Sequence, residues 1–192
     1  MLAKIIVIVL FISSCALAQT REEGEIYLSS DKVLKGYVKF ATMYFGIQLK
    51  KPKVFYWDQP KGGKRTVYRA TEVDSVVIPS ASTFYSYFIE DSKKKDFFKV
   101  LYKDNVSLIG KTQIIADTPT NIGGSSDEYW ILRNDSQQVY PLHQTTSWGR
   151  GLRSYAKEYL KDCPSLVEKI SNKELRLSDI FEIIKYYNNC IN

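Results

Sequence analysis

Two cysteines near the end of the chain, Cys163 and Cys190, offer the clearest chemistry that residue type and spacing suggest. Both lie at the ends of segments with helical periodicity, so helix packing can bring their thiols together. A pair of cysteines in an oxidising compartment favours a disulfide. A redox role would place two cysteines close together, and no C-x-x-C sequence occurs. We therefore expect a structural Cys163–Cys190 bridge, with two buried free thiols as the alternative.

Catalytic motifs are largely absent. His143 is the single histidine, which excludes clustered-histidine zinc sites, and no G-x-S-x-G sequence accompanies it as a triad partner. We expect His143 to lie at a strand end. Gly62-Gly63-Lys64-Arg65-Thr66 lacks the leading glycine spacing of a phosphate-binding loop and indicates a hairpin turn. We predict no metal, no cofactor and no enzymatic activity. A carboxylate-based hydrolase stays open, since only the fold brings such groups together.

The N-terminus has the layout of a secretory signal peptide over residues 1–18. Lys4 precedes an unbroken apolar run, Ile5–Ile12, which is far shorter than the roughly 20 residues that span a bilayer. Two processing routes remain open. Ala16-Leu17-Ala18 is an A-x-A cleavage site, whereas Ile12-Ser13-Ser14-Cys15 is the pattern of a bacterial lipobox, in which Cys15 carries the lipid. The first route releases the protein and the second anchors it to a membrane.

Composition and charge restrict the class of protein. The chain has 192 residues, of which 44% are hydrophobic and 25% charged, values typical of a folded domain and not of a disordered segment. The net charge is +6, but the basic residues are scattered along the chain. Together with export, this argues against a nucleic acid partner. We expect the protein in the periplasm, or at the outer membrane or cell surface, of a Gram-negative bacterium.

The region 24–145 has the pattern of a β-rich domain. Apolar residues alternate with period two, and turn residues interrupt them every eight to twelve positions. The pattern predicts about ten short strands in an antiparallel sheet, a sandwich or a partial barrel. No helical segment alternates with them, which argues against a parallel βαβ sheet. The glycine- and serine-rich stretch 118–127 is the strongest loop candidate.

The period changes to 3.6 residues in the tail, 148–192. Leu152, Tyr155, Ala156, Tyr159 and Leu160 fall on one helical face. Pro164 ends that helix and starts a second one, and a third helix follows Ser178, a suitable N-cap. The fold class is therefore α+β, with a short helical tail packed on the sheet.

Aromatic side chains are the best candidates for a binding surface. They form 14% of the chain and cluster in two predicted strands. Consecutive residues of a strand point to opposite faces, so some of these rings are expected at the surface beside the 118–127 loop. A strand buried on both faces is the alternative. The candidate surface residues are Tyr56, Trp57, Tyr85, Tyr87 and Trp130.

Two tail segments carry a resemblance to a known group of proteins. Tyr159-Leu160-Lys161-Asp162-Cys163-Pro164-Ser165-Leu166 and Tyr187-Asn188-Asn189-Cys190 resemble the D-C-P-x-L and Y-N-x-C motifs of uncharacterised exported proteins of Bacteroidota. Gly36-Tyr37-Val38-Lys39-Phe40 and residues 97–108 resemble that family's β-rich front part. The resemblance implies an envelope location and supports the cysteine pairing. It implies no activity.

Together these features predict a non-enzymatic envelope protein. The leading hypothesis is a protein-interaction or accessory subunit of an outer-membrane-associated assembly. A glycan- or ligand-binding β module is the alternative, and it predicts a row of exposed rings. The hydrolase hypothesis predicts two acidic side chains that converge in a cleft.

Overall fold

The computed structural model describes residues 21–40, 52–90, 92–115, 124–134, 136–144 and 151–191. The signal peptide predicted over 1–18, with Cys15, lies outside these residues, as does the first part of the 118–127 stretch, 118–123. In these described ranges, ten strands and three α-helices follow one another. They are β1 (Glu22–Leu28), β2 (Val33–Phe40), β3 (Lys53–Trp57), β4 (Thr66–Arg69), β5 (Val73–Ile78), β6 (Ser82–Ile89), β7 (Lys95–Tyr102), β8 (Val106–Ile115), β9 (Gly124–Arg133), β10 (Gln138–His143), α1 (Leu152–Tyr159), α2 (Pro164–Ser171) and α3 (Ile180–Ile191).

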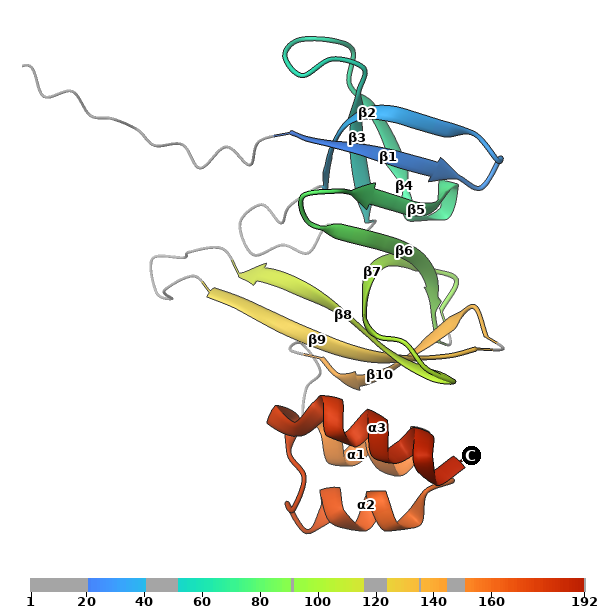
Figure 1. Ribbon diagram of the computed structural model, residues 1–192, viewed down its shortest axis with the longest axis vertical. Coiled ribbons are helices and arrows are strands. Elements are labelled where there is room, and N and C mark those ends of the chain that lie inside the picture. The colour runs from blue at the N-terminus through green and yellow to red at the C-terminus, as the bar shows by residue number, and fades with distance from the viewer. Residues whose placement is uncertain are drawn as a thin grey trace, which may run out of the picture.

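The α+β prediction is confirmed, and the strands form one coiled sheet in two parts (Figure 1). The order is β10-β9-β8-β7-β6-β5-β1-β2-β3-β4, and every neighbouring pair in it is antiparallel. β6 to β10 curl into a barrel that is closed by a further pairing between β10 and β6. In a five-stranded antiparallel meander the first and last strands point the same way. The closing pair must therefore be parallel, as it is here.

β6 connects the two parts because one of its edges is divided between two partners. Residues 82–85 pair with β5, whereas residues 88–89 pair with the start of β10. The other edge of β6 pairs continuously with β7. The closing ladder is short, since only two residue pairs join β6 to β10. The sheet thus bends one way before β6 and the other way after it.

Two cores lie on opposite faces of the sheet. The front core fills the concave side of β1 to β5 and includes Ile26, Val38 and Val76, all fully buried. The barrel core lies inside β6 to β10 and contains Phe98, Ile109, Trp130 and Val139. Phe97, next to Phe98, belongs to the front core, so the wall of the barrel separates the two cores.

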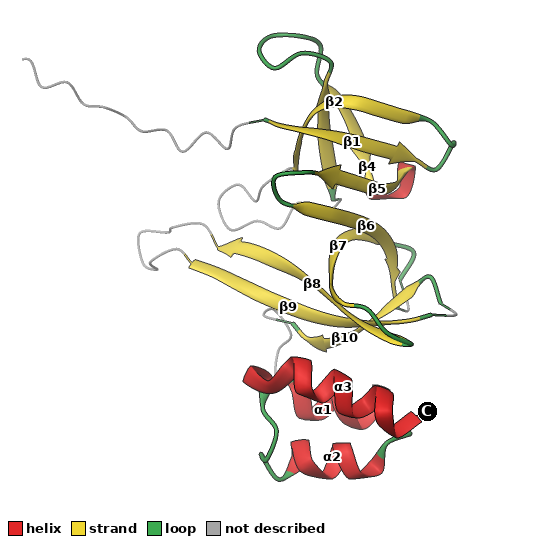
Figure 2. Cartoon of the chain, in the orientation of Figure 1, coloured by secondary structure: helices red, strands yellow, loops and turns green. Residues whose placement is uncertain are grey.

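The helices form a third layer that covers the outer face of the barrel (Figure 2). Their apolar stripes meet Val106, Leu108, Ile131 and Leu142 of β8, β9 and β10. Because these strands are buried on both faces, they carry consecutive apolar residues such as Leu108 and Ile109. The 3.6-residue period of the tail therefore predicted both the helices and the helix face that packs on the barrel.

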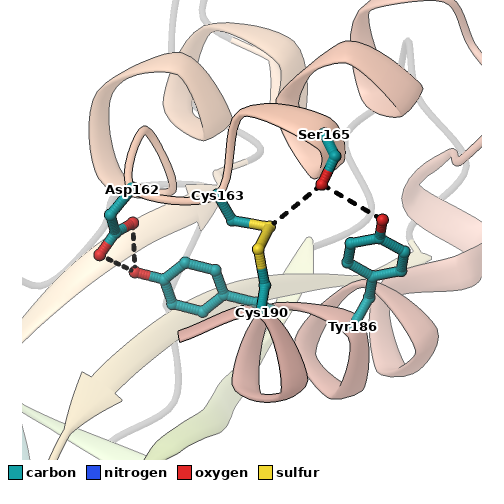
Figure 3. Close-up of a disulfide and its surroundings, with 6 residues drawn as sticks. Asp162, Cys163, Ser165, Tyr186 and Cys190 are labelled. Atoms are coloured by element: carbon teal, nitrogen blue, oxygen red, sulfur yellow. Dashed lines mark hydrogen bonds between the residues drawn. A yellow bond between two sulfur atoms is a disulfide. The ribbon is translucent and has the colours of Figure 1, made fainter. Parts of the chain in front are cut away.

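The predicted Cys163–Cys190 disulfide is present in the helical layer (Figure 3). It joins the start of α2 to the end of α3, with a Cα–Cα distance of 5.9 Å. Beside it, the Tyr186 hydroxyl donates to Ser165 Oγ at 3.2 Å. In the loop-entropy treatment, a bridge over about 26 residues stabilises the fold by about 3–4 kcal/mol. It holds the C-terminal helix on the barrel, where a chain end would otherwise fray.

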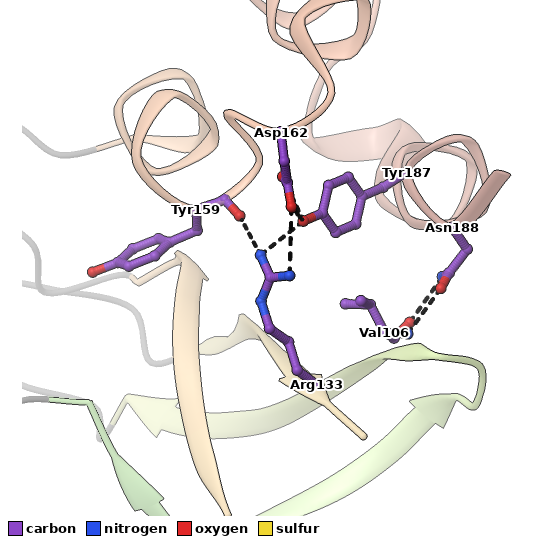
Figure 4. Close-up of polar contacts among 6 residues, drawn as sticks. All are labelled: Val106, Arg133, Tyr159, Asp162, Tyr187 and Asn188. Atoms are coloured by element: carbon purple, nitrogen blue, oxygen red, sulfur yellow. Dashed lines mark hydrogen bonds and ion pairs between the residues drawn. The ribbon is translucent and has the colours of Figure 1, made fainter. Parts of the chain in front are cut away.

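Two polar contacts fix the helices to the strands (Figure 4). The buried Asn188 amide accepts from Val106 N–H at 2.8 Å and donates to Val106 C=O at 2.9 Å, in the manner of a neighbouring strand. Arg133 of β9 donates to the Tyr159 carbonyl at 2.9 Å and to the Tyr187 hydroxyl at 2.7 Å. Tyr187 in turn donates to the Asp162 carboxylate. The orientation of the helical layer is therefore specified by polar geometry as well as by apolar packing.

Two predicted boundaries are corrected by the structure. Residues 124–127 of the predicted 118–127 loop belong to β9, which begins at Gly124 and pairs with the far end of β8. The third helix begins at Ile180, after a 3-10 turn over Leu177–Asp179. There Asp179, and not Ser178, accepts a backbone hydrogen bond, from the N–H of Arg176 at 2.8 Å.

Tyr187 makes the helical layer sensitive to alkaline pH. Burial, together with the hydrogen bond to Asp162, raises the pKa of Tyr187 to about 12, against an ordinary value of 10.0. A raised pKa in the folded state gives stability that is complete below pH 10 and is lost as pH rises from 10 to 12. We expect the free energy of unfolding, measured by urea titration, to fall across this window. Tyr187→Phe should reduce that fall, whereas Tyr186→Phe should leave it unchanged. An equal fall in wild type and Tyr187→Phe would contradict this assignment.

Candidate functional site

A row of three exposed side chains and one half-buried side chain crosses four neighbouring strands on the solvent side of the front sheet. Val33 of β2 is opposite Tyr27 of β1, and Tyr27 is opposite Ser75 of β5. Ser75 is in turn opposite Tyr85 of β6. Directly opposed side chains lie about 4.5–5.5 Å apart on one face, so the four form a continuous surface. We call Val33, Tyr27, Ser75 and Tyr85 the tyrosine row.

The exposure of the tyrosine row is unusual for its residue types. Val33 is 42% exposed, Tyr27 37% and Tyr85 39%. Among the described residues they make up three of the five large apolar side chains that are exposed. Single exposed apolar residues need no explanation, but a contiguous set on a rigid sheet is typical of a contact surface.

The tyrosine row continues into the barrel because the sheet reverses its curvature at β6. Tyr85 is opposite Phe98, which is fully buried in the barrel core. The rings follow one another at centroid distances of 6.1 Å for Tyr85–Tyr87, 6.5 Å for Tyr87–Phe98 and 5.4 Å for Phe98–Trp130. Burial raises the pKa of Tyr87, in accord with its place at the entrance of this series. The same face of the sheet is thus a solvent-facing surface over the front strands and the inner, core-facing side of the barrel strands.

Tyr27 is held in place by its own strand and the next. Its hydroxyl donates to Glu25 Oε2 at 2.7 Å, and Glu25 pairs with Lys35 of β2 at 2.8 Å. The hydrogen bonds from Lys35 and Tyr27 lower the pKa of Glu25, and the Glu25 carboxylate raises the pKa of Tyr27. The charges beside the tyrosine row therefore neutralise each other, and the row itself contains no charged residue.

The five aromatic residues predicted as a surface do not lie together. Tyr85 and Tyr87 belong to the series just described. Tyr56 faces the front core, and its hydroxyl donates to the Lys35 carbonyl at 3.0 Å. Trp57 is only 7% exposed, because the Arg21 guanidinium lies 4.1 Å from its ring centre.

Trp130 requires a correction, because it cannot belong to a surface. It is 2% exposed and lies inside the barrel. Conversely, sequence reasoning missed Tyr27 and Val33. Each stands in an ordinary alternating strand, and only the register between β1 and β2 places them beside Tyr85. The turn at Ser29-Ser30-Asp31 was the available signal, since a tight hairpin sets Tyr27 opposite Val33.

A charged cluster lies at one end of the barrel interior. Lys111 of β8 contacts Asp96 of β7 at 2.7 Å and Glu128 of β9 at 3.6 Å. Each side chain is largely buried, with Glu128 only 2% exposed. The hydrolase hypothesis expects two acidic side chains in a cleft, whereas Asp96 and Glu128 lie in the barrel interior and contact the Lys111 ammonium group. This is the arrangement of an ion pair that fixes the register of three strands.

Among the described residues, no group of three or more His, Cys, Asp or Glu side chains could hold a metal ion. His143 is the last residue of β10, as expected for a strand end. No helix in the described ranges is long and apolar enough to cross a bilayer.

Comparison with known proteins adds no assignment. No protein-family model, no curated protein and no solved structure matches this chain.

The ion cluster should be essential for the barrel. Lys111→Met would leave two carboxylates buried without their cation, and removal of one partner from a buried pair costs about 3–5 kcal/mol. We expect a loss of this size in the free energy of unfolding, measured by urea titration. Lys99→Met is the matched control, because Lys99 is exposed on β7, and it should change stability by less than about 0.5 kcal/mol. Equal stability of the two variants would contradict a structural role for the cluster.

Proposed function

We propose that this chain is a non-enzymatic binding protein of the bacterial envelope, which holds a partner protein against its tyrosine row. The observation that carries the proposal is the exposure of Val33, Tyr27 and Tyr85 along one register row of a single sheet face, with the half-buried Ser75 between the two tyrosines. Tyrosines that are partly exposed on a rigid support are typical of the residues that dominate protein–protein binding energy.

The scaffold suits binding better than catalysis. The row is built on paired strands, so its side chains lose little conformational freedom when a partner covers them. Tyr27 is further fixed by its hydrogen bond to Glu25. Asp96 and Glu128, the two carboxylates that meet inside the barrel, are paired with Lys111. A preorganised apolar surface of this kind fits an accessory subunit of an outer-membrane-associated assembly.

The proposed location is the periplasm, or the outer membrane or cell surface, of a Gram-negative bacterium. The signal-like segment 1–18 supports export, and Cys15 would carry a lipid anchor if the lipobox is processed. The Cys163–Cys190 bridge fits an oxidising compartment. The resemblance of the tail to exported proteins of Bacteroidota supports the same location.

An uncharged glycan is the second candidate for the same surface. The observation in its favour is chemical: the tyrosine row combines ring faces with the hydroxyl groups of Tyr27, Ser75 and Tyr85, and it lacks charge. Aromatic rings with nearby hydroxyl groups suit sugar rings, which present both apolar and polar faces.

The proposal is tested by affinity capture of tagged protein from gently solubilised native envelopes, followed by quantitative mass spectrometry. We expect a stoichiometric envelope protein with wild type. Tyr27→Ser with Tyr85→Ser should reduce its recovery at least tenfold, because the loss of a tyrosine hot spot costs about 2 kcal/mol and 1.4 kcal/mol is tenfold.

Phe181→Ser is the matched control, since Phe181 is 46% exposed but lies on α3, in the helical layer. It should capture the partner as wild type does. Equal capture by all three proteins would overturn the tyrosine row as the contact surface. Absence of any partner, combined with binding of the wild type to a neutral glycan array, would favour the glycan.

A further inference from the structure

Trp130 has a buried hydrogen-bond donor without an acceptor. Its side chain is 2% exposed in the barrel core, and no described residue accepts a hydrogen bond from its Nε1–H. It is the single buried side-chain nitrogen or oxygen atom in the described part of the chain that has no partner. Buried indole N–H groups normally donate a hydrogen bond within the protein. Burial removes the hydrogen bond to water, and a donor left without a partner costs free energy. Such exceptions are few in native proteins, and a bound water or ion is one of the explanations for them.

The position of Trp130 gives such an occupant a route of entry. Trp130 of β9 is opposite Pro141 of β10, and β10 pairs with β6 only through Gln138 and Val139. The part of β10 beside Trp130 therefore lies beyond the two residue pairs that close the barrel. Segments held by few contacts are among those that open locally in folded proteins. The ring series from Tyr85 through Tyr87 and Phe98 leads to Trp130 from the solvent side.

The surroundings select the chemistry of the occupant. Phe98, Ile109 and Val139 pack around Trp130 and are fully buried, so a charge would be costly there. The nearby ammonium of Lys111 is already matched by two carboxylates, which leaves no excess positive charge for an anion. A cation gains nothing from an N–H donor. What remains is a small neutral molecule with an oxygen acceptor.

We infer that the barrel interior is a binding site for one small neutral hydrogen-bond acceptor, which receives the Nε1–H of Trp130. A trapped water and the carbonyl or hydroxyl oxygen of an organic ligand share this chemistry. The site lies in the barrel core behind the tyrosine row, and the inference does not rest on the partner proposed for that row.

The test is NMR of the full chain with ¹⁵N-labelled tryptophan. The chain has three tryptophans, and Trp130→Phe identifies the indole signal of Trp130 by its loss. Trp57→Phe is the control for that identification. Magnetisation transfer from water to the Trp130 indole proton is measured first. Acetamide is then titrated as a neutral acceptor, with acetate and methylammonium as charged controls of similar size.

A cross-peak between the Trp130 indole proton and a long-lived water identifies water as the occupant and supports the inference. A saturable shift of the Trp130 signal with acetamide, but not with acetate or methylammonium, identifies an organic acceptor and supports it too. We expect the other two indole signals to shift at least fivefold less. The inference is overturned if the Trp130 signal shows neither a water contact nor a selective shift, or if it responds most strongly to acetate.

Discussion

The division of one strand edge between two partners determines the architecture of this protein. Residues 82–85 of β6 pair with β5, and residues 88–89 of β6 pair with β10. A sheet whose strand changes partners along one edge must bend in opposite senses on the two sides of that strand. The front sheet therefore encloses its core on one face, and the barrel encloses its core on the other. The tyrosine row lies where these two curvatures meet, at the end of a series of rings that continues into the barrel.

The helical layer is the second requirement of this arrangement. Closing β6 to β10 turns an apolar face outward on β8, β9 and β10, and the three helices cover it. Apolar packing alone would allow the helices to slide along the barrel. The Asn188 amide bonded to Val106 and the Arg133–Tyr187–Asp162 contacts define one orientation, since each polar group is satisfied in one geometry. The disulfide then joins the start of α2 to the end of α3. The tyrosine row is thus supported by the barrel and by the helical layer that covers it.

The sequence predicted those parts of the structure that depend on local pattern. Period-two alternation marked the strands, the change to a period of 3.6 marked the helices, and the cysteine count indicated the bridge. Register and curvature arise between residues that are distant in sequence, and no local pattern encodes them. This is why Trp130 was predicted at the surface but lies in the barrel, and why Tyr27 was missed as a neighbour of Tyr85. Likewise, Asp96, Lys111 and Glu128 stand in three different strands, and only the barrel brings their charges together.

Site-specific photo-cross-linking in living cells tests the central claim most directly. A photoreactive phenylalanine analogue at position 85 would lie in the tyrosine row, and the same analogue at the exposed Thr71 would serve as the reference position. The account predicts one discrete adduct with an envelope protein from position 85 and none from position 71. Adducts of equal yield from both positions, or none from position 85 although the protein is exported and folded, would contradict it.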